Sequence, residues 1–407
     1  MIALLACSAP PPVVPTVVLV SFDTTRADAI GPVLRELEGA RFELALAHAP
    51  TTLSSHTSMF SGLDPHGHGV VRNGFPVPDE VELLTTRYRD AGWDTLAVVG
   101  SLALESGMGL DRGFRVYEDF GWRRALAQVE QPASRVTERA LELVDRRDSA
   151  VGLFLFVHYY DPHMPWKVEP EGQVTGDLEG ITALTEARVA GTLSEATAAE
   201  ARALYRREVA VADDALGALL AGLEARGLEP VVAVTADHGE MLEEHPTRPY
   251  GHGADVDLEV THVPLVLVGL DREESVSRRV RLMDLGPTLL RVSGLEADLG
   301  EGGDLFAEGE APPGFAEANQ PHGQLAQEGW PNQPLDRSVV WKGHALERTP
   351  WSDEERFYHL DGGAPDEALR SQLEALLTAW DAKAPGSRQV EMSRETTEAL
   401  QALGYLD

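Results

Sequence analysis

The segment TVVLVSFD, residues Thr16 to Asp23, is a continuous apolar run that ends in an acidic residue. Such a run without polar alternation is typical of a strand that is buried on both faces of a parallel sheet. Similar runs follow at residues 95–100, 151–158, 230–235 and 263–268. Helical spacing of apolar residues predicts helices at 134–147, 196–227 and 282–293. Because buried strands alternate with helices, the sequence predicts an α/β fold with a doubly wound, mostly parallel sheet.

The C-terminal part of the chain has a different character. Residues 300–332 are rich in Gly, Pro, Glu and Gln, which predicts long surface loops. Short strands are predicted at 338–342 and 357–360, and helices at 365–380 and 394–403. We therefore expect a signal remnant or linker (1–15), a main α/β domain (16–298), a loop-rich connection (299–337) and a smaller α+β subdomain (338–407).

The chain is strongly acidic, with a net charge of −32 over 407 residues. This charge repels nucleic acid and anionic membrane surfaces, so neither is an expected partner. An anionic substrate can bind only where a metal ion or a local basic group reverses the field. The sequence gives no indication of the oligomeric state.

The single cysteine, Cys7, excludes an intrachain disulfide and a structural zinc site built on cysteines. It follows Leu4-Leu5-Ala6, which resembles the end of a bacterial lipoprotein signal, where the cysteine is lipidated after cleavage. The apolar run is short and no positive charge precedes it, so lipidation and a chance match both stay open. Lipidation would make Cys7 the membrane anchor of a protein in the bacterial cell envelope, either periplasmic or lipid-anchored.

Acidic and imidazole side chains follow three of the predicted strands. Asp23 follows the first, the segment 158–163 (HYYDPH) follows the third, and Asp237 and His238 follow the fourth. Each has a structural alternative, since Asp23 could cap a helix and His238 could be a buried, hydrogen-bonded histidine. In open α/β sheets, however, ligands bind where strands end. Together these residues predict a site for a divalent cation.

The segment TTLSSHTSMFSG, residues 51–62, contains seven hydroxyl groups and one histidine. A hydroxyl beside a cation loses its proton more easily and becomes a nucleophile at neutral pH. Such a hydroxyl is best placed at the start of a helix, where free N–H groups face an anion. Apolar Leu53, Met59 and Phe60 predict a helix that begins near Ser54, with Thr52 just before it.

These motifs, taken in order, make the chain resemble the sulfatase family of the alkaline phosphatase superfamily. The resemblance extends over nearly the whole length. The similar segments are VVLVSFDTTRAD (17–28), APTTLSSHTSMFSGLDPHGHGV (49–70), FLFVHYYDPHMPW (154–166), VTADHGE (234–240), GHG (251–253), THVPLVL (261–267), RLMDLGPTLLRVSGL (281–295) and ALGYLD (402–407).

The resemblance implies roles for six residues and one divalent metal ion as cofactor. It makes Asp23, Asp237 and His238 the metal ligands, Thr52 the nucleophile, and His163 and His252 the groups that bind or protonate the ester oxyanion. The metal could be Ca, Mg, Mn or Zn. His238 stands where typical sulfatases have Asn, and this slightly favours Zn or Mn.

Four departures from the family pattern matter for the chemistry. Thr52 takes the place of the Cys or Ser that typical members oxidise to formylglycine, and oxidation of a threonine would give a ketone. His56 replaces an Arg, and Thr24 replaces the second Asp of the metal pair. The segment 100–103 (GSLA) lacks the basic residues that grip sulfate in many members. A plain Thr nucleophile resembles the phosphodiesterase and phosphotransferase branches of the superfamily.

Three functions therefore stay open. The first is metal-dependent hydrolysis of a small-molecule or glycan ester of sulfate or phosphate, with Thr52 as the nucleophile. The second is transfer of a phosphate-linked group to an envelope glycan or lipid by the same site. The third is a non-catalytic sulfatase-fold lipoprotein that binds an anionic polymer.

Overall fold

The computed structural model describes residues 15–121, 131–166, 178–245, 250–319, 336–349 and 354–384. Its main sheet has eight strands. In spatial order these are β10 (Ser275–Val276), β2 (Ala40–Phe42), β9 (Leu265–Val268), β7 (Val231–Ala236), β1 (Thr16–Phe22), β6 (Leu153–Tyr159), β4 (Asp94–Val99) and β5 (Val116–Glu118). The mostly parallel α/β sheet predicted from the sequence is confirmed.

Strand β1 lies in the middle of this sheet, between β6 and β7, and pairs with both in parallel. All seven of its residues are buried. This burial on both faces explains why the strand is a continuous apolar run and shows no alternation. The register aligns Phe22 with Tyr159 on β6 and with Ala236 on β7, so the three strands end side by side.

The segment 263–268 differs from the prediction of one parallel strand. It is divided at Pro264 into β8 (His262–Val263), in a small sheet with β3 (Ala45–Leu46) and β11 (Val280–Arg281), and β9 in the main sheet. Proline has no N–H to donate to a strand ladder, and the Pro264 carbonyl instead accepts a hydrogen bond from Oγ1 of Thr235 at 2.7 Å. Strand β9 then runs antiparallel to β7.

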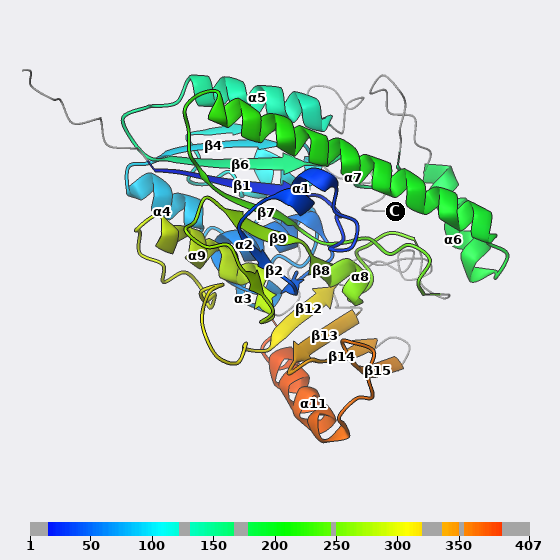
Figure 1. Cartoon of the computed structure of the whole chain (residues 1–407). Coiled ribbons are helices and arrows are strands. Elements are labelled where there is room, and N and C mark those ends of the chain that lie inside the picture. The colour runs from blue at the N-terminus through cyan, green and yellow to red at the C-terminus, as the bar shows by residue number, and fades with distance from the viewer. Residues whose placement is uncertain are drawn as a thin grey trace, which may run out of the picture.

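Helices cover both faces of the sheet (Figure 1). One face carries α1 (Pro32–Glu36), α5 (Ala133–Asp145) and α7 (Glu195–Glu224), and the other carries α2 (Thr52–Ser61), α4 (Leu84–Asp90) and α9 (Leu285–Val292). The other helices of this part of the chain are α3 (Pro65–His68), α6 (Leu178–Val189), α8 (Leu258–Thr261) and the 3₁₀ turns Leu102–Leu104, Ser106–Met108 and Leu282–Asp284. None of the helices within the described ranges is long and apolar enough to cross a membrane.

A separate antiparallel sheet lies near the C-terminal end of the chain (Figure 1). It consists of β12 (Gly314–Ala318), β13 (Asp336–Trp341), β14 (His344–Thr349) and β15 (Glu354–His359), with α11 (Glu367–Asp381) packed on β13 and β14. The sequence predicted β13, β15 and α11, whereas β12 and β14 were not predicted. The predicted helix 394–403, residues 320–335 of the predicted connection and Cys7 lie outside the described residues.

Trp380 of α11 joins this small sheet to the main domain. Its ring stacks on His66 of α3 at a centroid distance of 3.6 Å, and its indole N–H donates to Oδ2 of Asp64 at 2.6 Å. His66 in turn pairs with Glu317 of β12 through Nε2 and Oε2, 2.7 Å apart. Trp380 is only 5% exposed, so its large ring excludes water from the contact.

We expect Trp380→Ala to lower the free energy of unfolding by about 3–5 kcal/mol, because it removes a buried aromatic ring. Trp380→Phe retains a ring for the stack but loses the hydrogen bond to Asp64, and we expect it to cost about 1–2 kcal/mol. Urea denaturation followed by circular dichroism measures both. Trp341→Ala, at a half-buried position on β13, is the control with a smaller expected loss. Equal losses for Trp380→Ala and Trp341→Ala would contradict this role.

Candidate active site

The ends of β1 and β7 bring two carboxylates together. Asp23 directly follows β1, and Asp237 directly follows β7. Because these parallel strands are neighbours in register, both side chains emerge at the same edge of the sheet. The backbone N–H of Asp23 donates to the Tyr159 carbonyl of β6 at 2.8 Å, which ties the third strand end to the same place.

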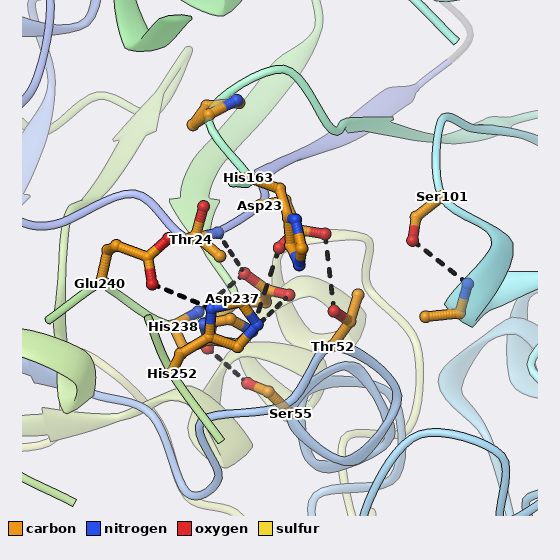
Figure 2. A network of polar contacts seen from close by, with 12 residues as sticks. Asp23, Thr24, Thr52, Ser55, Ser101, His163, Asp237, His238, Glu240 and His252 are labelled. Carbon is orange, nitrogen blue, oxygen red and sulfur yellow. Dashed lines mark hydrogen bonds and ion pairs between the residues drawn. The ribbon is translucent and has the colours of Figure 1, made fainter. Parts of the chain in front are cut away.

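Asp23, Asp237 and His238 form a buried cluster whose potential ligand atoms all lie within 4.8 Å of one another. Nε2 of His238 lies 3.5 Å from Oδ2 of Asp237 and 3.9 Å from Oδ1 of Asp23. Figure 2 shows these side chains converging. The cluster combines the two ligand types, carboxylate and imidazole, that divalent transition metals take in proteins.

Oδ2 of Asp237 and Nε2 of His238 are both buried and have no hydrogen-bond partner in the described part of the chain. The other oxygen of Asp237 accepts the N–H groups of Thr24, at 3.1 Å, and His238, at 2.8 Å. Burial, and then the charge of Asp23, raises the pKa of the Asp237 carboxyl. A cation would neutralise this repulsion and satisfy the unmatched atoms, so the residues fit a metal ion.

A second group, His56, His158 and Asp237, also has its polar atoms within 4.8 Å. However, Nδ1–H of His56 donates to the Thr52 carbonyl at 2.7 Å, and its Nε2 accepts from Oγ of Ser21 at 3.0 Å. Burial lowers the pKa of His56 to about 3, so the ring is neutral. His56 therefore holds the first turn of α2, and the cluster with His238 fits a cation better.

Thr52 is the first residue of α2, which begins two residues earlier than the sequence predicted. Thr51 precedes it with extended backbone and makes no side-chain capping bond, while Gly62 ends the helix with a φ of +68°. Oγ1 of Thr52 donates to Oδ2 of Asp23 at 3.5 Å (Figure 2). The hydroxyl thus lies at a helix N-terminus and against the carboxylate cluster.

Most other hydroxyls of the segment 51–62 are engaged in holding α2. Ser55 donates to the Asp237 carbonyl at 2.6 Å, and Thr57 donates to the Leu53 carbonyl at 2.7 Å. Ser54 and Ser61 donate in the same way to the carbonyls of Val70 and Thr57, and Oγ of Ser58 is hydrogen-bonded to the ring Nε2 of His68 at 3.0 Å. Their structural use separates them from Thr52, whose hydroxyl contacts a carboxylate of the cluster.

Two further imidazoles adjoin the cluster. The His252 ring lies 4.5 Å from the His238 ring and 4.8 Å from the His163 ring, measured between centroids. Nδ1–H of His252 donates to Oε1 of Glu240 at 3.0 Å. Burial and the two neighbouring imidazoles hold the pKa of His252 well below its usual value. The structure therefore brings all six residues predicted for the site into one network, and their roles stay predictions.

The structure adds Asn73, which the sequence did not single out. Its Oδ1 accepts the N–H of Leu53 at 2.8 Å, so the side chain caps the first turn of α2 next to Thr52. Its Nδ2 is buried and has no hydrogen-bond partner in the described ranges. Asn73 follows α3 in a loop, and no motif of its own marks it. It supplies an unused donor beside the proposed nucleophile.

Thr24 also has an unexpected conformation. Its φ of +46° lies in the left-handed region, which a β-branched residue adopts only under strain. This conformation directs the backbone N–H of Thr24 to Asp237, although its side chain replaces the second Asp of the family pattern. The backbone here orients a carboxylate of the cluster.

Comparison with known proteins identifies the family of the chain. The sequence profile of the family described as Sulfatase matches residues 15–295. The low-salt glycan biosynthesis sulfotransferase Agl7 of Haloferax volcanii is 26% identical over 70% of this chain and 62% of its own. Human iduronate 2-sulfatase is 28% identical over 33% of this chain and 30% of its own, so the chain spans less than two thirds of either relative.

Among solved structures, the phosphonate monoester hydrolase SpPMH from Silicibacter pomeroyi has a similar fold. Its TM-score is 0.67 and its sequence identity 20%, over 90% of this chain and 94% of that chain. Because the sulfatase profile covers well over half of the sequence, the chain belongs to the sulfatase family.

Proposed function

We propose that this protein hydrolyses phosphate or sulfate esters with Thr52 as the nucleophile. One observation supports this most strongly: the Thr52 hydroxyl, at the start of α2, lies 3.5 Å from a carboxylate of the Asp23, Asp237 and His238 cluster. A hydroxyl, a helix N-terminus and a potential cation site thus meet at one point. This is the combination that an attack on a tetrahedral anionic ester requires.

Asp23, Asp237 and His238 would hold the divalent cation, which would supply positive charge that lowers the pKa of the adjacent hydroxyl. His238 makes Zn or Mn a better fit than Ca. In the proposed reaction the Thr52 hydroxyl loses its proton, Oγ1 forms a bond to phosphorus or sulfur, and the ester oxygen leaves with its bonding electrons and takes up one proton to become the product hydroxyl. Water then cleaves the Thr52 ester and regenerates the hydroxyl.

The remaining residues would stabilise charge on the ester oxygens. The side-chain N–H group of Asn73 that lacks a partner adjoins the first turn of α2, where backbone N–H groups also face an anion. His163 and His252 lie close to one another, and the His252 ring adjoins that of His238. We propose that these rings bind the oxygen that leaves. Because the Nδ1–H of His252 is donated to Glu240, His252 donates to that oxygen only after Nε2 has taken up a proton.

Transfer to an acceptor hydroxyl is the second candidate. It is favoured by one finding, the similarity over 70% of this chain to a protein named as a glycan sulfotransferase. The first half of the reaction would be the same, and an acceptor hydroxyl would replace water in the second. The two functions differ only in what removes the group from Thr52.

A substrate panel tests both functions. The purified chain is assayed on an aryl sulfate, an aryl phosphate monoester and a phosphodiester, with its metal content measured in parallel. Release of inorganic phosphate or sulfate supports the hydrolase. If the aryl group is released but the anion appears on an added alcohol or sugar, the transferase is supported. A protein that binds no metal and turns over none of these esters would contradict both.

We expect Asn73→Ala to lower kcat by about 10²–10³-fold, because it removes an oxyanion donor and the cap of α2. Asn73→Asp separates the two effects. The aspartate retains an oxygen for the Leu53 N–H but replaces the donor with a negative charge, so it should retain stability and lose activity at least as strongly. Steady-state kinetics and thermal melting measure the pair. Full activity in Asn73→Asp would show that Asn73 is only a cap.

A further inference from the structure

Arg188 of α6 is a buried cation. The residue is 5% exposed, and none of its three side-chain nitrogens has a hydrogen-bond partner in the described part of the chain. Its guanidinium lies over the ring of Tyr250, with its central carbon 5.3 Å from the centroid. Tyr250 is 4% exposed, and its hydroxyl also has no hydrogen-bond partner there. Two unsatisfied donor groups are thus buried together.

Burying these donors without hydrogen-bond partners costs folding free energy unless a ligand supplies acceptors. A buried guanidinium without partners loses its hydration and gains little in return, and burial lowers the pKa of Arg188 accordingly. The acids whose charge reaches it are Glu244 and Asp255. Glu244 already pairs with Arg26 at 2.5 Å and accepts the N–H of Leu242 at 3.1 Å. The negative charges of these two acids favour the charged form of Arg188, but neither acid hydrogen-bonds its guanidinium.

The pair lies beside the candidate active site. Tyr250 is two residues from His252, and its backbone N–H donates to Oγ1 of Thr185 on α6 at 3.2 Å. The Tyr250 ring lies 6.4 Å from the ring of Trp166, which belongs to the same segment as His163. Helix α6 is therefore attached to the chain that carries both proposed oxyanion-binding histidines.

We propose that Arg188 and Tyr250 bind a second negatively charged group of the substrate, such as a carboxylate, a sulfate or a phosphate. This inference rests on the proposed ester hydrolysis, since it places the second group next to the ester. A guanidinium offers two parallel N–H donors to such an anion, and the phenol O–H adds a third. The substrate is then an ester with at least two anionic groups.

Arg202 of α7 provides a matched control. It also acts electrostatically on Tyr250, but its guanidinium is already paired with Glu195, at 2.9 Å, and with Glu243. Substitution of Arg202 also removes one positive charge near Tyr250. Unlike Arg188, however, Arg202 already uses its N–H groups in ion pairs. If substitution of Arg188 alone alters substrate preference, the cause is the loss of hydrogen bonds to the substrate. A general change of the electrostatic potential would appear in both variants.

The test compares two aryl esters that differ by one ring carboxylate. For the wild type we expect a preference for the carboxylated ester. Arg188→Gln should reduce the ratio of the two kcat/KM values by roughly ten- to a hundredfold, the range for lost hydrogen bonds to a charged group. Arg202→Gln should leave the ratio within about twofold. An equal effect of both variants, or no change of ratio in Arg188→Gln, would overturn the proposal.

A binding measurement separates this site from the catalytic one. Inorganic sulfate is titrated by calorimetry into the full chain carrying Asp237→Asn, where the proposed metal cluster is impaired. Binding that persists there and weakens at least tenfold on adding Arg188→Gln supports the anion site. Sulfate binding that is lost with Asp237→Asn alone, or that ignores Arg188→Gln, contradicts it. If the protein binds sulfate through Arg188 but cleaves no ester, the proposed hydrolysis is contradicted. The proposal that the substrate is an ester with two anionic groups then fails as well, whereas the anion site at Arg188 is supported.

Discussion

Thr52→Ala should lower kcat/KM for ester cleavage by about 10³-fold or more, because the bond-forming oxygen is removed. The fold should survive, since the Thr52 hydroxyl makes one long hydrogen bond to Asp23. Steady-state kinetics on the best ester of the panel measures the loss. Metal content should change little, because Asp23, Asp237 and His238 remain.

Two controls sharpen this expectation. Thr57→Ala removes a buried hydroxyl from the same helix, one that donates to the Leu53 carbonyl, and should retain activity. Thr52→Ser restores the nucleophilic oxygen without the methyl group and should recover most of the lost rate. If Thr52→Ala and Thr57→Ala lower the rate equally, the hydroxyl of Thr52 supports the helix and performs no chemistry.

Asp237→Asn should impair function and stabilise the metal-free protein at the same time. Activity should fall by about 10³-fold or more as the cation site loses a carboxylate. In the metal-free state, however, Asp237 is a buried charge beside buried Asp23, and burial and that charge raise its pKa. Removing one of two like charges should increase the free energy of unfolding by about 1–3 kcal/mol near pH 7.

Asp213→Asn is the matched control for the expected gain in the free energy of unfolding. Asp213 is also a fully buried aspartate, but its two oxygens accept the N–H groups of Val33 and Leu34 at 2.7 and 2.8 Å. Asparagine can replace only one of those acceptors, so this variant should lower stability and retain activity. Thermal melting with and without chelator measures both. A lower melting temperature for metal-free Asp237→Asn than for the metal-free wild type would contradict a cation site at this position.

The main sheet was predictable because its central strands are buried on both faces. The strands β1, β4, β6 and β7 each contain a short apolar run, which is typical of a strand buried on both faces of a parallel sheet. Very short strands carry no such signal. The two residues Ala45–Leu46 form a strand only because Val280–Arg281 and His262–Val263, far away in the sequence, pair with them. The split of 263–268 had a local cause, Pro264, that the apolar pattern concealed.

The candidate site was predictable where residues directly follow a strand. Asp23 and Asp237 converge because β1 and β7 are neighbours in register, which follows from the fold class. Asn73 and Arg188 were not predictable in the same way. Asn73 reaches the start of α2 from a loop, and Arg188 meets Tyr250 across about sixty residues of sequence, so only the folded chain places them.

The threonine at position 52 determines which covalent intermediate this site can form. A threonine cannot form the aldehyde that typical family members use, yet its hydroxyl occupies the start of α2 against the carboxylate cluster. Nucleophilic attack by Thr52 therefore requires a direct ester between the substrate group and Thr52.

Trapping that ester tests the account most directly. The protein is mixed with its best aryl ester, quenched in acid within one turnover, digested and examined by mass spectrometry. We predict one phosphoryl or sulfuryl group on the peptide that contains Thr52 and none on that peptide in Thr52→Ala. The modified peptide should accumulate when cleavage of the Thr52 ester by water is slowed. Turnover at an undiminished rate in Thr52→Ala, or an adduct on a different residue, would contradict the assignment of Thr52 as the nucleophile.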